Sequence, residues 1–167
     1  MIQNILSKNL VINSLLVFLI FLTDRISKIY VIHLDQKLLG SEIFSSKFLN
    51  ISLIWNEGIA FGLLSFNQKN LYNSLTILIL MIILVIFFII LKSDGIKKYS
   101  LLIILGGAIG NVFDRIFYNA VPDFIDLHIG KFHWFIFNVA DVFITCGIFV
   151  MILFEFIGNS KNDYEKN

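Results

Sequence analysis

Long apolar runs alternate with short polar segments along the chain, and four of these runs are long enough to cross a membrane. A transmembrane helix needs about 20 mostly apolar residues. We expect the spans at residues 10–32, 71–91, 99–117 and 134–157. The second run carries no charge, whereas Asp24, Arg25 and Lys28 interrupt the last third of the first. The first run has no small-residue cleavage site, so we interpret it as a retained span and not as a cleaved signal peptide.

The basic turn KSDGIKK between the second and third spans predicts the orientation of the chain. Lysine and arginine concentrate on the cytoplasmic side of membrane proteins. This turn and both termini are therefore expected in the cytoplasm. The two longer connecting segments, 33–70 and 118–133, are then expected on the outer side, although they also carry lysines and the charge bias is modest.

The first outer segment contains the apolar stretch FLNISLIWNEGIAFGLLSF. Within it, Ile51, Leu53 and Trp55 alternate with polar residues, and Ile54 breaks the pattern. Such alternation is typical of a β-strand with one buried face. We therefore predict an all-α membrane protein, with four transmembrane helices and a small extracytoplasmic β element on the membrane surface. Residues 1–167 would form a single integral membrane domain.

Composition supports a membrane protein and narrows its partners. Of the 167 residues 57% are hydrophobic, one is proline, and the mean hydropathy is +0.85. A soluble domain of this size would need more polar residues on its surface. The net charge of +1 gives no electrostatic reason to expect nucleic-acid binding. We expect a monomer surrounded by membrane lipids, with its single cysteine, Cys146, as a small buried apolar residue.

Polar residues recur at helical spacing near one end of three spans. These sets are Asp24 and Lys28 in the first span, Asn111, Asp114 and Arg115 in the third, and Asn138, Asp141 and Thr145 in the fourth. Residues three or four apart share one face of a helix. Odd spans run outward and even spans run inward, so the three sets meet at one depth near the outer surface. Asp123 follows the third span in the connecting loop.

Each set also has a purely structural interpretation. Asp24 with Lys28, and Asp114 with Arg115, could be ion pairs whose charges offset each other in the membrane. Asn111 in the third span and Asn138 in the fourth could form hydrogen bonds between the helices. We expect Arg115 to bond within the helix bundle, to Asp114 or to backbone carbonyls, and one member of that adjacent pair to find its partner on another span.

Asp123 and Asp141 are the candidates for chemistry. Asp141 has no cation within one helical turn, whereas Asp123 taken alone would be an ordinary loop carboxylate. Two carboxylates held close cannot both ionise cheaply, so they share a proton. One can then act as general base on a water while the other donates to a carbonyl oxygen, which is aspartic-protease chemistry. We expect their carboxyl oxygens within about 3–5 Å of each other.

Other hydrolytic chemistries fit the sequence less well. It contains no H-E-x-x-H motif and no G-x-S-x-G motif. The three histidines, His33, His128 and His133, lie in or beside the outer segments without the spacing of a zinc site. We therefore expect neither a metal nor a cofactor.

Five motifs resemble, in order and spacing, those of the type II, or lipoprotein, signal peptidases of bacteria. They are DRISK (24–28), NEGIAFG (56–62), GGAIGNVFDR (106–115), VPDFID (121–126) and FNVAD (137–141). The third motif is the most specific of the five. Two positions depart from the family pattern, because Glu57 stands where a small residue is common and Pro122 precedes the loop aspartate. Neither change removes a side chain that the chemistry needs.

The resemblance implies a four-span aspartic endopeptidase of the bacterial inner membrane, with its active site toward the outer face. It would cut diacylglyceryl-modified prolipoproteins just before the lipid-bearing cysteine. Asp123 and Asp141 would be the catalytic pair. The supporting residues would be Asn56, Asn111, Asp114, Arg115, Asn138, Asp24 and Lys28. The segment 56–62 would form a small β platform on the membrane surface.

Two other functional classes remain open. A small proton- or ion-coupled carrier also places carboxylates within its spans, although here they cluster on one side of the membrane and do not cross it. A structural subunit of a larger membrane complex would use the polar residues as contacts between helices. That interpretation leaves Asp123, which lies outside every span, unexplained.

Overall fold

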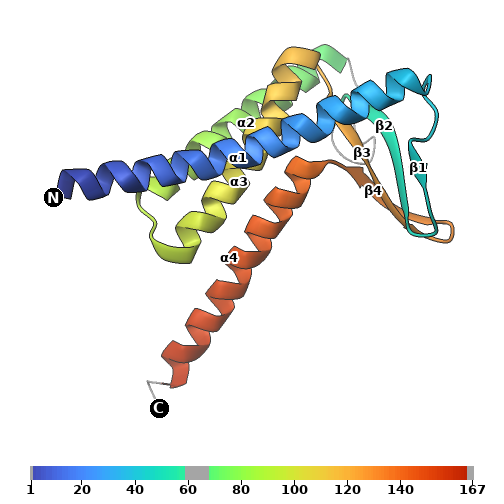
Figure 1. Cartoon of the computed structure of the whole chain (residues 1–167). Helices are drawn as coiled ribbons and strands as arrows, with labels where there is room; N and C mark the ends of the chain where they lie inside the picture. The colour runs from blue at the N-terminus through green and yellow to red at the C-terminus, as the bar shows by residue number, and fades with distance from the viewer. Residues whose placement is uncertain (1, 59–67, 165–167) are drawn as a thin grey trace.

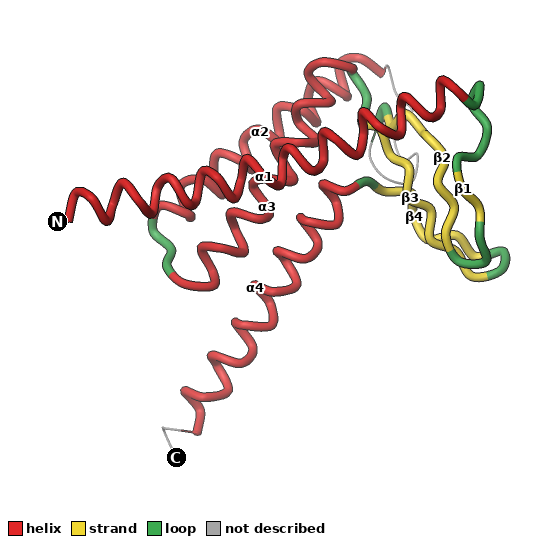
Figure 2. The backbone as a smooth tube through the Cα atoms, in the orientation of Figure 1, coloured by secondary structure: helices red, strands yellow, loops and turns green. Residues whose placement is uncertain are grey.

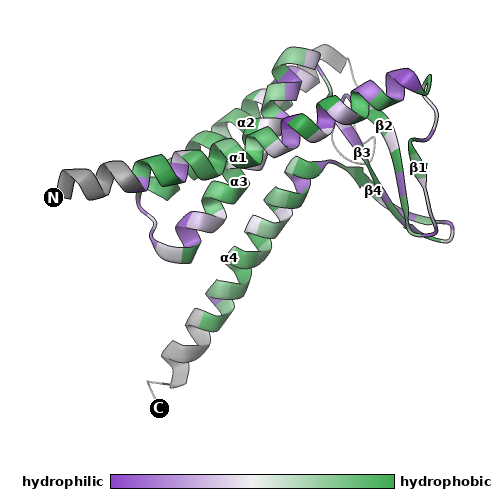
Figure 3. Cartoon of the chain, in the orientation of Figure 1, coloured by the Kyte–Doolittle hydropathy of each residue, from purple (hydrophilic) through white to green (hydrophobic). Residues whose placement is uncertain are grey.

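The computed structural model describes residues 2–58 and 68–164, which form four long helices and a four-stranded sheet (Figure 1). The helices are α1 (Ile2–Lys37), α2 (Gln68–Leu91), α3 (Gly95–Tyr118) and α4 (Val139–Tyr164). Each contains a stretch long and apolar enough to cross a membrane, and apolar residues follow most of its length (Figure 3). These stretches are Asn9–Lys37, Tyr72–Leu91, Gly95–Tyr118 and Val139–Ile157. The predicted fold class is confirmed.

The fourth helix begins later than the sequence predicts. Residues 134–137 were expected in the span, but they belong to strand β4 (Phe132–Phe137), and α4 begins at Val139. A short run of aromatic and β-branched residues fits a strand as well as a helix. Here the run pairs with a neighbouring strand, and the helix begins only after Asn138.

Helix α3 lies at the centre of the bundle and contacts each of the other three helices. Small residues allow these close approaches, as is common between membrane helices. A methyl group on Gly107 would lie 2.6 Å from the carbonyl oxygen of Ala140, and one on Gly147 would lie 2.8 Å from that of Ser100. The apolar core lies on the same helix, around Leu101 and Leu105. Helix α4 is therefore fixed against α3 along its first half.

The outward faces of the helices are apolar and exposed. Helix α2 is the extreme case, since only 6% of its spanning stretch is buried within the protein. Large side chains such as Phe18, Phe87 and Phe149 are about half exposed, which suits contact with lipid tails. Cys146 is also exposed, so the expectation that it is buried was wrong.

The sheet lies at the end of the bundle, beside the C-terminal end of α1 (Figure 2). Its order is β1-β2-β3-β4, and all neighbouring strands are antiparallel. The strands are β1 (Phe44–Ser45), β2 (Leu49–Asn56), β3 (Val121–Ile129) and β4 (Phe132–Phe137). Strands β3 and β4 form a hairpin that turns at Gly130, whose φ of 61° suits glycine. This hairpin joins α3 to α4.

Strand β2 explains the interrupted alternation in the sequence. Ile51 pairs with Ile125 but Ile54 pairs with Asp123, so β2 holds one extra residue in a bulge. Asp123 therefore lies in a strand, and the expectation that it lies in a loop was wrong. Of the predicted platform at 56–62, Asn56 ends β2, and Glu57 and Gly58 belong to no strand. Residues 59–62 lie outside the described part of the chain.

Candidate active site

The first turn of α4 is built around a reciprocal pair of hydrogen bonds. The backbone N–H of Asp141 donates to Oδ1 of Asn138 (3.2 Å), and the backbone N–H of Asn138 donates to Oδ2 of Asp141 (3.1 Å). This is a capping box, in which the residue before the helix and the third residue within it satisfy each other's backbone. The i, i+3 spacing of the FNVAD motif thus has a structural cause. It also places the Asp141 carboxylate at the positive end of the helix dipole.

Asn111 on α3 fixes the other oxygen of Asp141. Its Nδ2 donates to Oδ1 of Asp141 over 2.8 Å. The amide cannot turn over, because its Oδ1 accepts hydrogen bonds from Nζ of Lys28 (2.9 Å) and Nδ2 of Asn138 (3.1 Å). Asn111 therefore points its NH₂ group at the Asp141 carboxylate and its carbonyl oxygen at Lys28 and Asn138.

Asp123 receives one amide donor on each of its oxygens. Asn138 donates to Oδ1 over 2.6 Å, and Asn56, at the end of β2, donates to Oδ2 over 2.9 Å. Asp123 is only 5% exposed. Burial raises the pKa of the Asp123 carboxyl above its usual range, the two amide donors partly offset this, and the nearby Asp141 carboxylate adds to it. Asp123 therefore holds a proton more tightly than an exposed aspartate.

Four buried charges behind the two aspartates balance one another. Lys28 contacts Asp24 (3.0 Å) and Asp114 (2.6 Å), while Arg25 contacts Asp24 (2.8 Å) and both oxygens of Asp114. Two cations and two carboxylates leave the cluster neutral, as burial in a membrane requires. The predicted Asp24–Lys28 pair is confirmed. Arg25 was not predicted as part of the site, because its partner Asp114 is 89 residues away in sequence.

Asp114 does not pair with Arg115, so that interpretation was wrong. Adjacent helical residues point in different directions, and Asp114 faces the cations of α1 while Arg115 faces away from them. Nη2 of Arg115 donates to the carbonyl oxygen of Gly58 (3.3 Å), and its guanidinium lies 5.4 Å from the ring centre of Tyr72. Arg115 therefore bonds to a backbone carbonyl as predicted, but this carbonyl lies in the outer segment and not within the helix bundle. The prediction that one of the pair finds its partner on another span is confirmed by the contacts of Asp114 with α1.

Asp24 also positions the start of α4. Its Oδ1 accepts a hydrogen bond from the backbone N–H of Ala140 over 3.0 Å. Such N–H groups in the first turn have no partner within the helix. Gly110 on α3 makes room for this contact, because a methyl group there would lie 2.5 Å from Oδ2 of Asp24. Three helices thus meet at one carboxylate.

Asp123 and Asp141 line the same cavity of about 350 Å³ at the end of the bundle next to the sheet. Asn56, Asn111, Arg115 and Asn138 line it too. The structure therefore brings the proposed pair together with four of the supporting residues. Asp24, Lys28 and Asp114 lie behind them, and hydrogen bonds to Asn111 and to the start of α4 link them to the cavity. The catalytic roles of the pair stay a prediction.

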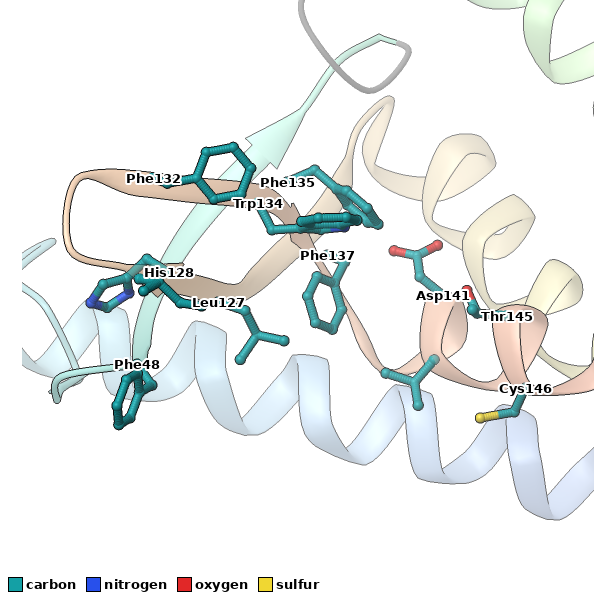
Figure 4. A pocket seen from close by; sticks show the side chains of 12 residues that line it. Phe48, Leu127, His128, Phe132, Trp134, Phe135, Phe137, Asp141, Thr145 and Cys146 are labelled. Carbon is teal, nitrogen blue, oxygen red and sulfur yellow. The ribbon is translucent and has the colours of Figure 1, made fainter. Parts of the chain in front are cut away.

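A second, apolar cavity opens beside Asp141 (Figure 4). It has a volume of about 500 Å³ and is lined mainly by aromatic and aliphatic side chains from β3, β4 and the start of α4. Figure 4 shows Asp141, Thr145 and Cys146 at one end, next to Trp134 and Phe137. An apolar chain could therefore lie against the carboxylate.

Comparison with known protein families relates the chain to a group of membrane proteases. Residues 16–157 match the family described as signal peptidase (SPase) II. A protein of Pelagibacter ubique (strain HTCC1062), named lipoprotein signal peptidase, is 51% identical over 96% of each chain. A protein of the same name from Anaplasma marginale (strain Florida) is 36% identical and covers 92% of this chain and 89% of its own length.

Solved structures show the same architecture. Two structures described as a bacterial membrane enzyme, solved by the in meso method at 2.3 and 1.9 Å, superpose with TM-scores of 0.67 and 0.70. Their sequences are 27% and 28% identical to this chain. The alignments cover 90% and 84% of this chain and 90% of each solved chain.

Proposed function

The chain belongs to the signal peptidase II family, and we propose that it cuts the signal peptide from diacylglyceryl-modified prolipoproteins with Asp123 and Asp141 as its catalytic dyad. One observation carries this proposal. Two carboxylates from different elements line one cavity, each oxygen accepts a hydrogen bond from an amide, and no cation bonds directly to either group in the described residues. Such a pair can hold one proton between two carboxylates.

The dyad would activate water in the manner of an aspartic protease. The ionised carboxylate takes a proton from a water, whose oxygen attacks the carbonyl carbon of the scissile peptide. The protonated carboxylate gives its proton to the carbonyl oxygen. When the tetrahedral intermediate breaks its C–N bond, the first carboxylate returns a proton to the leaving nitrogen. The second carboxylate takes a proton from a hydroxyl of the intermediate, so the new carboxyl group forms and the dyad again holds one proton. We propose that the dyad oxygens lie within about 3–5 Å of each other in the reacting complex.

The asparagines and the buried charges would position this dyad. Asn56, Asn111 and Asn138 orient the carboxylates through the hydrogen bonds described above. The neutral cluster of Asp24, Arg25, Lys28 and Asp114 holds α1, α3 and α4 in register behind them. Arg115 would brace the segment after β2 through the carbonyl of Gly58, and would not contact the peptide.

The apolar cavity beside Asp141 supports a lipid-bearing substrate. Its aromatic and aliphatic lining can replace the lipid tails around an acyl chain, so the chain stays out of water when it binds there. We propose that the diacylglyceryl group occupies this cavity while the signal helix lies between the spans. A substrate anchored in this way presents its cleavage site at a fixed depth, which raises the effective concentration of the peptide bond at the dyad.

The position of the dyad reduces the free-energy cost of placing a carboxylate in a membrane protein. A carboxylate at the centre of a membrane helix costs roughly 2.5–3.5 kcal/mol. Asp141 lies in the first turn of α4 and lines a cavity at the end of the bundle, so it avoids most of that cost. The basic turn between α2 and α3 lies at the opposite end, and we propose that it and both termini are cytoplasmic and that the dyad faces the outer side.

Cleavage of a defined substrate by the purified protein tests the proposal. Two synthetic precursor peptides would be compared in detergent, identical except for a diacylglyceryl thioether on the cysteine after the scissile bond. We expect mass spectrometry to detect cleavage before the lipid-bearing cysteine, and little cleavage of the unmodified peptide. Proton or ion flux in liposomes without cleavage of either peptide would instead support a carrier.

A further inference from the structure

The outer end of the β3–β4 hairpin carries a cluster of side chains that the dyad does not use. His128 and His133 are direct cross-strand partners, and their rings stack with centres 4.9 Å apart and planes 20° from parallel. Nδ1 of His133 lies 2.8 Å from Oδ2 of Asp126. The sequence spacing shows no known metal motif, because the antiparallel pairing of the strands is what brings the three residues together.

Two atoms of this cluster are buried without a hydrogen-bond partner in the described residues. One is Oδ1 of Asp126, whose side chain belongs to a residue only 7% exposed, and the other is Nδ1 of His128. Buried polar atoms almost always have a partner, because an unsatisfied one loses its hydration without compensation. A carboxylate oxygen and the Nδ1 of an imidazole that is protonated at Nε2 can each coordinate a cation, so the cluster offers two unused ligand atoms.

We propose that Asp126, His128 and His133 bind a divalent transition-metal ion of the zinc type. One candidate ligand atom from each residue lies within 4.8 Å of the other two. Ligand atoms around a tetrahedral zinc lie about 3.4 Å apart, given bond lengths of about 2.0–2.1 Å. For both rings to point at one ion, they must turn out of their stacked arrangement, and His133 is free to turn because its side chain is 51% exposed.

The donor set favours zinc over the hard cations. Two imidazoles and one carboxylate are typical ligands of Zn²⁺, whereas Ca²⁺ and Mg²⁺ require six or more oxygen ligands. Three protein ligands leave a fourth position for water. Cys146 lies on α4, outside the cluster.

A metal ion here would hold the two strands that deliver the active-site residues. β3 carries Asp123, three residues before Asp126, and β4 leads directly into Asn138. Fixing the far end of the hairpin would restrict its bending and twisting. This inference does not depend on the proposed protease activity, since it rests only on the geometry of the hairpin.

Metal titration of the full-length protein in detergent tests the proposal. The protein, with any purification tag removed, would be stripped with a chelator, dialysed and titrated with CoCl₂ while visible absorption is recorded. We expect a saturable signal at one equivalent that ZnCl₂ displaces, and a higher Tm with ZnCl₂. No saturable binding, or a stoichiometry far from one, would overturn the proposal.

Variants locate the ion. His133→Ala and Asp126→Asn should each weaken Co²⁺ binding at least tenfold and abolish the zinc-dependent rise in Tm. His33→Ala is the matched control, because His33 is the only other histidine and lies on α1. Binding that survives both cluster substitutions, or that disappears in His33→Ala, would refute the assignment. If Asp126→Asn does not fold, the exposed His133 still provides the test.

Discussion

Asn138 and Asp141 satisfy each other's backbone N–H groups at the start of α4, over 3.2 and 3.1 Å. The same Asn138 donates its side-chain amide to Asp123 over 2.6 Å. One fully buried asparagine thus begins the helix and links the two carboxylates. The start of a transmembrane helix and the geometry of the candidate dyad are therefore one structural feature.

Substituting Asn138 separates its two contributions. Asn138→Ala removes the helix cap, which costs about 1 kcal/mol, and also removes a donor from Asp123. Asn138→Asp retains a capping oxygen but places a third carboxylate beside Asp123. We expect Asn138→Ala to lower both the Tm and the rate of cleavage. The Asn138→Asp variant should keep a Tm close to wild type, because its helix cap is retained, but should lose most of its cleavage activity. Thermal unfolding and turnover of a lipidated precursor would be measured together. Wild-type cleavage by Asn138→Ala would contradict the proposed role.

The net charge of the buried cluster behind the dyad should determine how stable the folded protein is. Lys28→Met leaves the buried cluster with two carboxylates and one cation, and removing one partner of a buried ion pair costs about 3–5 kcal/mol. Adding Asp24→Asn restores neutrality, and the asparagine oxygen can still accept from Ala140. We therefore expect the double variant to be more stable than Lys28→Met alone, as measured by Tm. If the two changes destabilise additively, the cluster does not act through its net charge.

Gly110 should be intolerant of even one methyl group. Gly110→Ala would place Cβ 2.5 Å from Oδ2 of Asp24, so Asp24 must move away from Ala140 or α1 must shift from α3. Overpacking of this kind typically costs about 1–3 kcal/mol. Ile116→Ala on the same helix is the control, because Ile116 is 57% exposed and should change Tm little. Equal Tm values for the two variants would show that the helices are not packed as closely as described.

The pKa of Asp123 gives a stability prediction with a definite sign. Burial raises it above its ordinary value of 3.8, so between the two values the folded protein binds more protons than the unfolded chain. The stability contributed by this group is therefore complete below pH 3.8 and is lost as pH rises through the folded-state pKa. We expect the Tm of wild type, relative to Asp123→Asn, to fall as pH rises over this window.

Asn56→Ala is the matched comparison for that titration. Its amide stabilises the ionised Asp123, and removing the donor should raise the pKa of Asp123 further. The decline in relative Tm should then extend to higher pH than in wild type. An unchanged pH dependence would mean that Asp123 does not titrate in the environment described.

The features predicted from sequence are those set by local spacing. Runs of about 20 apolar residues predict the four helices, and the i, i+4 spacing of Asp24 and Lys28 predicts their contact. The placement of the polar sets at one depth follows from the alternating direction of the spans. These predictions succeed because each depends only on helix geometry and on the thickness of a membrane.

The features missed depend on contacts between distant segments. Arg25 was overlooked because Asp114 lies 89 residues away, and the Asp126 cluster because its spacing is set across a hairpin. Asp123 was assigned to a loop because it directly follows the predicted third span, yet here it pairs with a bulged strand. Strand pairing depends on the partner segment, which local sequence does not specify.

The central claim is that Asp123 and Asp141 act together as one catalytic unit. Asp123→Asn, Asp141→Asn and the double variant would be compared with wild type for turnover of a lipidated precursor, and each would be scored for Tm. Asp94→Asn, at the opposite end of α3, serves as the control. We predict that each single change removes nearly all turnover while the protein stays folded, and that the double change adds little, because effects within one catalytic unit are not additive. Full turnover by either folded single variant would contradict the account.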